Sequence, residues 1–381
     1  MRSRPMPERP APLVLVTTPP EDLPFGSHAA VAADGRRLLA TSLSHRLGRL
    51  GAAVAPLAAV PPESFHWGRW FTAGARKALA GAGGRVDAVG YAGGGAMPLL
   101  ADDALDQLLS PQAGEVVANN RFSADAFVVA GDLPAALAAL EGCETDNAAP
   151  RRLEEAGFAS RDLGKAPWAR FDVDTTLDLA LLHLAAHLSE TQSVPIDGAV
   201  GRFLEMARLP GGGALEVPHL ERIGEVMRDR AGELVVAGRV PAGTSQHLET
   251  ETVCRVRAFV EERGMRSARG SDAPPRSLLA ALMMRSSPSE LVAELSRLGD
   301  AVVLDTRVLM AALSGSADAA SWPPEEERLA SDFGDHSRVA TPWLRELTEA
   351  AAQASVPFLF GGHALVSDGL RLLVAAAWHG R

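Results

Sequence analysis

The stretch "ARFDVDTTLDLALLHLA", residues 169–185, decides how the fold is interpreted, because acids interrupt an otherwise apolar segment. From Leu177 onward the residues are almost all apolar, which predicts a buried helix. Thr175 or Thr176, followed by Asp178, resembles the cap and first turn of that helix. At such a cap a hydroxyl accepts backbone N–H groups and an acid complements the helix dipole. The stretch therefore predicts a helix that begins directly after a strand.

Asp172 and Asp174 have no part in such a cap, and they lie on either side of Val173. In a strand, two alternate residues point to the same face. Two carboxylates on one face repel each other unless a cation or an arginine neutralises them, and Mg²⁺ is a hard cation that such oxygens favour. Two interpretations are therefore open: the acids hold a metal ion, or the stretch only caps a helix.

Short apolar runs alternate with helical patterns in the first half of the chain. We expect strands at residues 13–18, 52–60, 86–95 (ending in a glycine turn), 114–120 and 125–131, and helices at 35–51, 71–83, 98–110 and 133–142. Strands that alternate with helices at this spacing imply βαβ units. The sequence therefore predicts an α/β protein with a mainly parallel, Rossmann-like sheet.

The pattern changes near residue 190, where helical segments with proline and glycine breaks begin. Residues 264–277 are polar, basic and broken by a proline pair, which is typical of an exposed loop. Beyond this loop we expect helices at 289–299 and 341–354 and strands at 300–306 and 356–362. The sequence thus predicts two domains, 1–190 and 191–381. The second is mixed α/β, and its strands either extend the first sheet or build a second one.

The composition limits the classes of function. The 381 residues carry a net charge of −10, with Lys77 and Lys165 as the only lysines, so a broad nucleic-acid interface is not expected. No run approaches the roughly 18 apolar residues that span a bilayer, and "PLVLV" is too short for a signal peptide. Cys143 and Cys254 lack the spacing of a zinc site or a disulfide framework. We expect a cytoplasmic protein without a membrane partner, and the oligomeric state, a homo-oligomer included, is left open.

Two segments after expected strands are candidates for substrate binding. The segment "YAGGGAMPLL" places Gly94 and Gly95 where open α/β sheets bind ligands, and glycine lets a backbone approach a phosphate. A plain tight turn would explain the same glycines. Asn119, Asn120 and Ser123 cluster between two apolar strands, either as the polar residues of a hairpin or as the wall of a polar pocket.

The acidic stretch also carries a family resemblance. "FDVDTTLDL" (171–179) resembles D-x-D-T-x-x-D-L, the signature that closes the sheet in nucleotidyltransferases with a GT-A-like α/β fold. "GAMPLL" (95–100) takes the place of the family's S-D-x-P-L-L, and "DNAAPRRLEEAGF" (146–158) fits the helix before the acidic strand. The resemblance covers roughly residues 12–190. It is closest to the phospholactate guanylyltransferases of deazaflavin-cofactor biosynthesis and more remote to molybdenum-cofactor guanylyltransferases and sugar-acid cytidylyltransferases.

This resemblance implies a metal-dependent nucleotidyltransferase, which moves a nucleoside monophosphate from a nucleoside triphosphate to a small phosphorylated acid or sugar and releases pyrophosphate. It implies Asp174 as a catalytic ligand of Mg²⁺, supported by Asp172. "HAAVAADGRRLL" (28–39) resembles the family's K-x-L-x-x-x-x-G-x-P-L-L element, with His28 at the lysine position. The residues left to hold the triphosphate are Gly26, Ser27, His28, Arg36 and Arg37.

The chain departs from the family pattern in two places. Ala96 replaces the acidic metal ligand before "PLL", and the loop before His28 lacks the family's basic residue. Phosphoryl-type transfer depends on metal and cationic clamping of the phosphates. The alternative interpretation is therefore a non-catalytic ligand-binding or regulatory protein on the same fold.

The second half of the chain offers a separate candidate site. Asp305 and Arg307 lie at the end of one expected strand, and His363 follows a glycine pair at the end of another. Because the carboxyl ends of parallel strands meet at one edge of a sheet, these side chains could converge. A third interpretation therefore places an active site around them, on a phosphorylated substrate.

Overall fold

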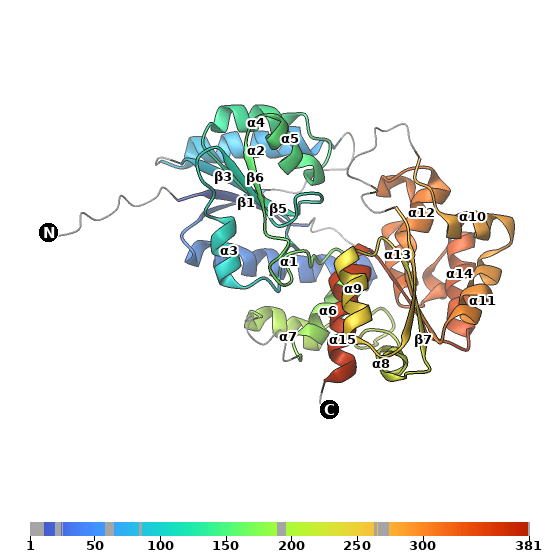
Figure 1. The fold of residues 1–381 in the computed structure, drawn as a ribbon. Helices are drawn as coiled ribbons and strands as arrows, with labels where there is room; N and C mark the ends of the chain where they lie inside the picture. The colour runs from blue at the N-terminus through green and yellow to red at the C-terminus, as the bar shows by residue number, and fades with distance from the viewer. Residues whose placement is uncertain are drawn as a thin grey trace. The chain divides into compact units, whose positions relative to one another are not determined.

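A computed structural model gives the fold of the chain (Figure 1). It describes residues 11–19, 24, 26–57, 65–83, 86–188, 196–262, 265 and 274–379. The protein is α/β, with 51% helix and 16% strand, and contains two parallel or mainly parallel sheets. The chain folds into two compact units, which we call the first unit (Met1–Pro20 and Arg37–Ala169) and the second unit (Glu21–Arg36 and Arg170–Arg381).

The first unit is built on a six-stranded sheet with the order β2-β1-β3-β5-β4-β6. Its strands are β1 (Leu13–Thr17), β2 (Ala53–Leu57), β3 (Ala88–Ala92), β4 (Glu115–Ala118), β5 (Ala126–Ala130) and β6 (Ala159–Asp162). β5 is antiparallel to both neighbours and the other pairings are parallel. Every residue of β3 and β5 is buried, as expected for strands covered on both faces. The predicted mainly parallel sheet is confirmed.

Helices cover both faces of this sheet. They are α1 (His28–Arg49, of which the part from Arg37 belongs to this unit), α2 (Trp67–Gly81), α3 (Asp102–Leu108), α4 (Leu133–Glu141) and α5 (Ala149–Glu155). Figure 1 shows α2, α4 and α5 on one face and α1 and α3 on the other. Under α2, Trp67 stacks on Phe71 at 5.1 Å between ring centroids and meets Tyr91 edge-on at 5.2 Å. Such aromatic pairs add roughly 0.5–1.5 kcal/mol beyond the burial of their area.

The second unit contains a separate sheet, so the strands of the second half do not extend the first one. Its strands are β7 (Glu233–Gly238), β8 (Arg255–Val260), β9 (Ala301–Asp305) and β10 (Phe358–Gly361). They are all parallel and have the order β10-β9-β7-β8. β9 and β10 are completely buried, whereas β8 is an edge strand with four exposed residues.

Helices also lie on both faces of this second sheet. They are α6 (Thr176–Ala185), α7 (Gly198–Met206), α8 (Leu220–Arg228), α9 (Ala242–Glu251), α10 (Leu278–Arg285), α11 (Pro288–Leu298), α12 (Thr306–Ser314), α13 (Glu325–Asp332), α14 (Pro342–Gln353) and α15 (Leu370–Trp378). α10, α11, α12 and α14 pack on one face, and α8, α9 and α15 lie on the other (Figure 1). The described helices include none that is long and apolar enough to cross a bilayer.

Each sheet has a point between two parallel neighbouring strands at which the order of its strands reverses. In the first sheet, β1 is followed by β2 on one side and by β3 on the other, so the reversal lies between β1 and β3. In the second sheet, β7 is followed by β8 on one side and by β9 on the other, so the reversal lies between β7 and β9. Open α/β sheets bind ligands outside the carboxyl ends of the strands at such a point. We call these places the first and second switch points.

The division into units differs from the boundary expected near residue 190. The second unit begins at Arg170 and also includes residues 21–36. The reason is the buried helix α6, which packs in the second unit: a Cβ on Gly361 would lie 2.8 Å from the Cδ2 of Leu177. The first helix likewise begins at His28, earlier than residue 35, because its first turn is held by the second unit, as described below. Most of the expected loop at 264–277 lies outside the described residues.

Candidate functional site

The first switch point is a glycine turn tied to the end of β1. The Ala96 N–H donates to the carbonyl of Gly93 at 3.1 Å, which closes the turn after β3. The N–H of Gly94 donates to the Thr17 hydroxyl at 3.0 Å and so joins the segments that leave β3 and β1. In the part of the chain that the structure describes, the buried N–H of Gly95 meets no acceptor. This edge therefore offers a backbone donor to a ligand.

The residue after the turn has an unfavourable backbone conformation. Met97 is buried and has a φ of 53°, which L side chains adopt rarely. Strain of this kind costs on the order of 1–3 kcal/mol and is concentrated at functional sites. Ala96, at the place of the family's acidic ligand, is 3% exposed, so a carboxylate there would be buried. The first switch point thus contains an unfavourable backbone conformation at Met97 and has no charged side chain at position 96.

Asn119 serves the β4–β5 hairpin. Its Oδ1 accepts the N–H groups of Asp125 and Ala126, each at 3.0 Å. Its Nδ2 donates to Asp125 Oδ2 and to the Ala169 carbonyl, each at 3.1 Å. The buried amide therefore has all its main hydrogen bonds within the protein, as the hairpin interpretation predicts.

The neighbouring polar side chains are also engaged with one another. Asn120 Oδ1 accepts the backbone N–H two residues further on at 3.2 Å. The Ser123 hydroxyl donates to Asn147 Oδ1, and the Tyr91 hydroxyl donates to Asp146 Oδ2 at 3.2 Å. Burial and the charge of Asp146 raise the pKa of Tyr91 well above its ordinary value. Asp146 and Asn147 thus bind hydroxyl groups, and α5 has no side-chain cap.

The acidic stretch caps α6 with a reciprocal pair of hydrogen bonds. The Thr175 hydroxyl accepts the N–H of Asp178 at 3.2 Å, and Asp178 Oδ2 accepts the N–H of Thr175 at 2.8 Å. Asp178 Oδ2 also accepts the N–H of Asp174 and the hydroxyl hydrogen of Thr175. This is a capping box, so Thr175, and not Thr176, is the cap residue. The described strand before this cap, β6, ends at Asp162, so the cap does not directly follow a strand, in contrast to the expectation.

Asp178 is an unusual member of this cap because it is buried. Burial, followed by the negative charge of Asp174, raises the pKa of Asp178 to about 7, although its hydrogen bonds act in the other direction. Its Oδ1 has no hydrogen-bond partner among the described residues. The charge of Asp178 also contributes to the raised pKa of Arg307, after that of Asp332 and Asp305.

The two acids outside the cap differ in exposure. Asp172 is half-buried and its Oδ1 accepts the N–H of Val173 at 3.0 Å. Asp174 is exposed, and its carboxylate makes no hydrogen bond or ion pair within the described chain. The described part of the chain contains no group of three or more His, Cys, Asp or Glu side chains that could hold a metal ion. Mg²⁺ in phosphate-transferring sites takes one or two carboxylates, with waters and substrate phosphates as the other ligands. Asp174 could serve as such a carboxylate ligand. The described residues do not provide a complete set of ligands for a metal ion.

The N-terminus of α1 is already occupied by a carboxylate. Glu326 Oε1 accepts the N–H of His28 at 3.1 Å, and its Oε2 accepts the N–H of Ala29 at 2.9 Å. The Ser27 hydroxyl accepts the N–H of Ala30 at 3.0 Å. The donors that a triphosphate would use at this helix are thus bound to α13 and to Ser27. Sequence reasoning missed Glu326, which lies 298 residues from its partner.

His28 does not act as a substitute for lysine in this structure. Its ring is 1% exposed and stacks on Phe333 at 5.5 Å between centroids. Burial lowers the pKa of His28, although the nearby Glu326 partly opposes this. Within the described ranges neither ring nitrogen has a hydrogen-bond partner, and the same is true of the Nε of Arg36. Gly26, with a φ of 74°, forms the turn before the helix.

The second switch point is dominated by charge. The Arg239 guanidinium, directly after β7, binds Asp305 at the end of β9, with Nε–Oδ2 at 2.6 Å and Nη2–Oδ1 at 3.1 Å. Asp305 is completely buried; burial raises its pKa, but the charges of Arg239, His363 and Arg307 bring it below its ordinary value. Gly238 has a φ of 119°, and a Cβ there would lie 2.3 Å from the Cβ of Asp305.

A second ion pair adjoins the first. Arg307 binds Asp332 through two parallel hydrogen bonds, one of them at 2.6 Å between Nη2 and Oδ2. The structure therefore places Asp305, Arg307 and His363 together at one edge, where their sequence positions put them. Arg239 and Asp332 were missed. Arg239 had a usable signal, since it follows a glycine at the end of the apolar run "LVVAG".

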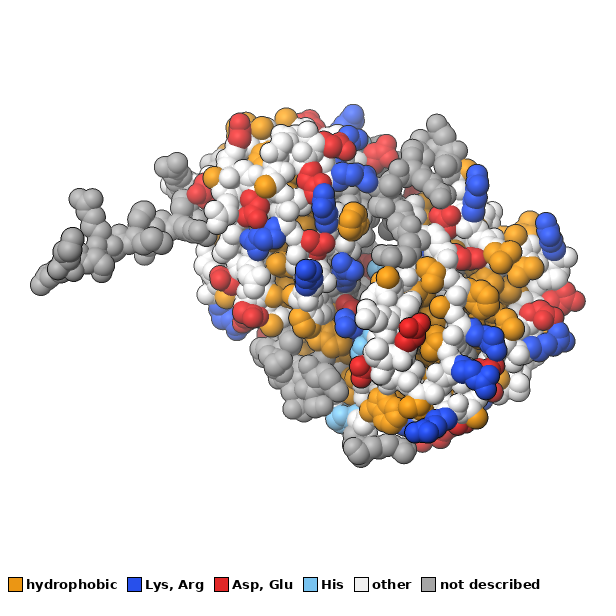
Figure 2. Space-filling model, in the orientation of Figure 1, with side chains coloured by type: hydrophobic (Ala, Val, Ile, Leu, Met, Phe, Trp, Pro, Cys, Tyr) orange, Lys and Arg blue, Asp and Glu red, His pale blue; other side chains and the backbone are white. Residues whose placement is uncertain are grey.

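The predicted site residues are thus divided between the units. The first unit contains Gly94, Gly95, Asn119, Asn120 and Ser123, and the second contains Gly26, Ser27, His28, Arg36, Asp172, Asp174, Asp305, Arg307 and His363. On the face shown in Figure 2, arginine and acidic side chains are interspersed over the first unit, without a broad area of one sign.

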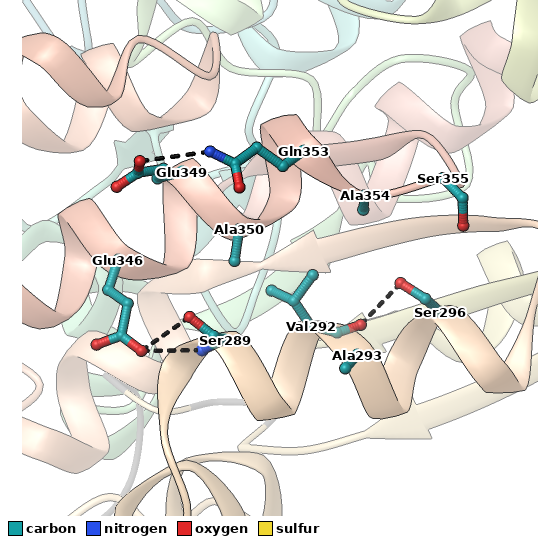
Figure 3. A pocket seen from close by; sticks show the side chains of 10 residues that line it. All are labelled: Ser289, Val292, Ala293, Ser296, Glu346, Glu349, Ala350, Gln353, Ala354 and Ser355. Atoms are coloured by element: carbon teal, nitrogen blue, oxygen red, sulfur yellow. Dashed lines mark hydrogen bonds between the residues drawn. The ribbon is translucent and has the colours of Figure 1, made fainter.

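An open groove between α11 and α14 contains none of these residues (Figure 3). At one end, Glu346 accepts the hydroxyl and the backbone N–H of Ser289, and Gln353 donates to Glu349 near the other end. Its remaining lining consists mainly of alanine and serine. The polar groups that edge the groove bind one another, so they do not converge on a reacting group.

Comparison with protein-family models, with curated proteins and with solved structures finds no match to the chain. Function is therefore inferred from the two switch points and the acidic stretch.

Proposed function

We propose that the protein is a Mg²⁺-dependent nucleotidyltransferase that joins a nucleoside monophosphate to a small phosphorylated acid or sugar. The observation that carries this proposal is the exposed carboxylate of Asp174, which makes no hydrogen bond or ion pair within the described residues. Such a carboxylate suits Mg²⁺, which phosphate-transferring sites bind through one or two carboxylates with waters and substrate phosphates as the other ligands.

Each residue has a limited role in this reaction. A phosphate oxygen of the acceptor attacks the α-phosphorus in line, and the bond from the α-phosphorus to the bridging oxygen breaks, so pyrophosphate leaves with its electron pair. Mg²⁺ neutralises charge on the phosphates when it is bound. Asp174, whose exposed carboxylate meets no partner in the described part of the chain, would hold the ion, and Asp172 would support it. No covalent enzyme intermediate is needed.

The second candidate function is nucleotide binding without turnover. The carboxylate of Glu326 at the N-terminus of α1 favours it, because the phosphate-binding donors implied by the family resemblance are filled. The burial of His28, which lowers the pKa of its ring, points the same way.

Thermal unfolding with GTP, CTP, ATP and UTP, each with and without Mg²⁺, separates these functions. A nucleotide at about 100 times its dissociation constant adds roughly 2.7 kcal/mol of stability. We expect a Mg²⁺-dependent shift with one nucleotide and pyrophosphate release with a suitable acceptor. Asp174→Asn should abolish both, while Asp106→Asn, an exposed acid on α3, should abolish neither. Stabilisation without release in the wild type would identify a binding protein, and the absence of any shift would refute both functions.

A further inference from the structure

The second switch point has a binding group that the proposed transfer does not use. The chain leaves β7 through Arg239 toward α9 on one face, and it leaves β9 through Asp305 toward α12 on the other. The two segments therefore diverge at the place where open α/β sheets bind their ligands. Arg239 lies directly at this divergence.

The guanidinium of Arg239 is only partly used by the protein. A guanidinium has five N–H donors, and two of them bind Asp305. In the described part of the chain the other three, on Nη1 and Nη2, meet no acceptor, although the side chain is only 14% exposed. A mostly buried arginine with three of its five donors available is suited to bind an oxyanion.

Asp305 fixes the orientation of this donor set. The carboxylate cannot turn away, because it also accepts the backbone N–H of Arg307 at 3.2 Å as the cap of α12. It accepts the backbone N–H of Arg239 at 3.4 Å as well. Gly238 permits this close approach of the two strand ends. Because Asp305 already fixes the guanidinium of Arg239, little side-chain entropy is lost when a ligand binds to the remaining donors.

The other cations of this edge are already neutralised or engaged. The guanidinium of Arg307 donates two hydrogen bonds to Asp332 and one to the hydroxyl of Thr306. His363 lies close enough to Asp305 to lower its pKa, and it has contacts of its own. Three of the five Arg307 donors are thus used and its charge is paired with Asp332, whereas Arg239 uses two of its five, so within the described residues Arg239 has more donors left for a ligand.

We propose that the second switch point binds a small oxyanion, the phosphate or carboxylate group of a metabolite, on the Arg239 guanidinium. The ligand approaches past the segment that leads into α9, where Gly243 is exposed and a Cβ would meet nothing within 4 Å. This binding goes beyond the nucleotide transfer of the proposed function.

The test is calorimetric titration of the full chain at low salt with inorganic phosphate in one arm and succinate in the other. Arg239→Gln should weaken binding of the effective anion at least tenfold. Arg239→Lys, which keeps the charge and loses the fork, should weaken it less. Arg257→Gln is the matched control, since Arg257 is also paired with a carboxylate, Glu233, away from this edge. It should bind as the wild type does.

A second pair of variants keeps the test valid if Arg239→Gln fails to fold. Gly243→Asp adds a negative charge to the exposed first turn of α9, where an acid is favourable to the helix. It should fold and weaken anion binding at least tenfold, while Gly243→Asn, which adds the same volume without charge, should not. Asp174→Asn should leave anion binding unchanged, which separates this site from the proposed transfer.

The outcomes are distinct. Binding in the phosphate arm alone identifies a phosphorylated ligand, and binding in the succinate arm alone identifies a carboxylate ligand; either one supports the site if it depends on Arg239 and on the charge at position 243. Absence of binding in both arms, or binding that neither change affects, would overturn the proposal.

Discussion

The two switch points have the same topology and opposite chemistry. The first consists of a glycine turn and a threonine hydroxyl, and among the described residues the N–H of Gly95 there meets no acceptor. The second consists of two ion pairs that join Arg239 to Asp305 and Arg307 to Asp332. The topology sets where a ligand can bind, and the two or three residues after each strand set which ligand.

The two switch points also differ in the feature that lowers the stability of the folded protein. At the first point the unfavourable feature is a backbone conformation, at Met97. At the second it is the desolvation of charges, which is repaid only while both partners of each pair are present. The second edge should therefore be far more sensitive to the loss of a single side chain.

The largest effect is expected at the buried pair of Arg307 and Asp332. Arg307→Met leaves Asp332, 2% exposed, without its partner, and should lower the free energy of unfolding by about 3–5 kcal/mol. Urea unfolding of the full chain measures it. The double variant Arg307→Met/Asp332→Leu removes both charges and should recover most of the loss. A double variant no more stable than the single one would show that the pair is not what holds this edge.

Gly238→Ala tests the close approach of the two strand ends. The added Cβ would overlap Asp305, and the φ of 119° is unfavourable for alanine, so we expect a loss of about 1–3 kcal/mol in the free energy of unfolding. Gly243→Ala, five residues later in open space at the start of α9, should change it by less than about 0.5 kcal/mol. Equal effects of the two substitutions in urea unfolding would contradict the geometry of the second switch point.

Asp178 makes the cap of α6 depend on pH. Its pKa is raised to about 7 in the folded protein by burial and by Asp174, against an ordinary value of 3.8. A carboxyl with a raised folded pKa contributes stability that is present below the unfolded pKa and is lost as the pH rises toward the folded one. In metal-free buffer the free energy of unfolding should fall between pH 4 and 7, relative to Asp178→Asn, by at most about 1.4 kcal/mol per unit. Parallel curves for the two proteins would exclude this titration.

The sequence predicts those features that depend on residues close together in the chain. The alternation of strands and helices, the cap at Thr175 and Asp178, and the position of Asp305 and His363 at strand ends all follow from local patterns. The order of the strands and the separate second sheet required the structure, because pairing between distant strands has no local signal.

The features that the sequence did not reveal are contacts across long separations. Glu326 reaches α1 over 298 residues, and it changes the meaning of the segment at 26–29 from a phosphate loop to a capped helix. Asn119 shows the opposite case, since its bonds to Asp125 and Ala126 are local and the hairpin interpretation already contained them.

The smallest effect, and the one that sharpens the comparison most, concerns Glu326. Glu326→Gln replaces a charged cap by a neutral one at the N-terminus of α1, and should lower the free energy of unfolding by about 1 kcal/mol. Glu325→Gln, at the exposed neighbour of Glu326 in the first turn of α13, is the matched control and should change the free energy of unfolding less.

Nucleotide affinity of Glu326→Gln gives the second readout. If the N-terminus of α1 is a phosphate site, removal of the competing charge should tighten nucleotide binding. If binding rests on the glycine turn alone, affinity should stay the same, and the first switch point would then bind its ligand without any helix N-terminus.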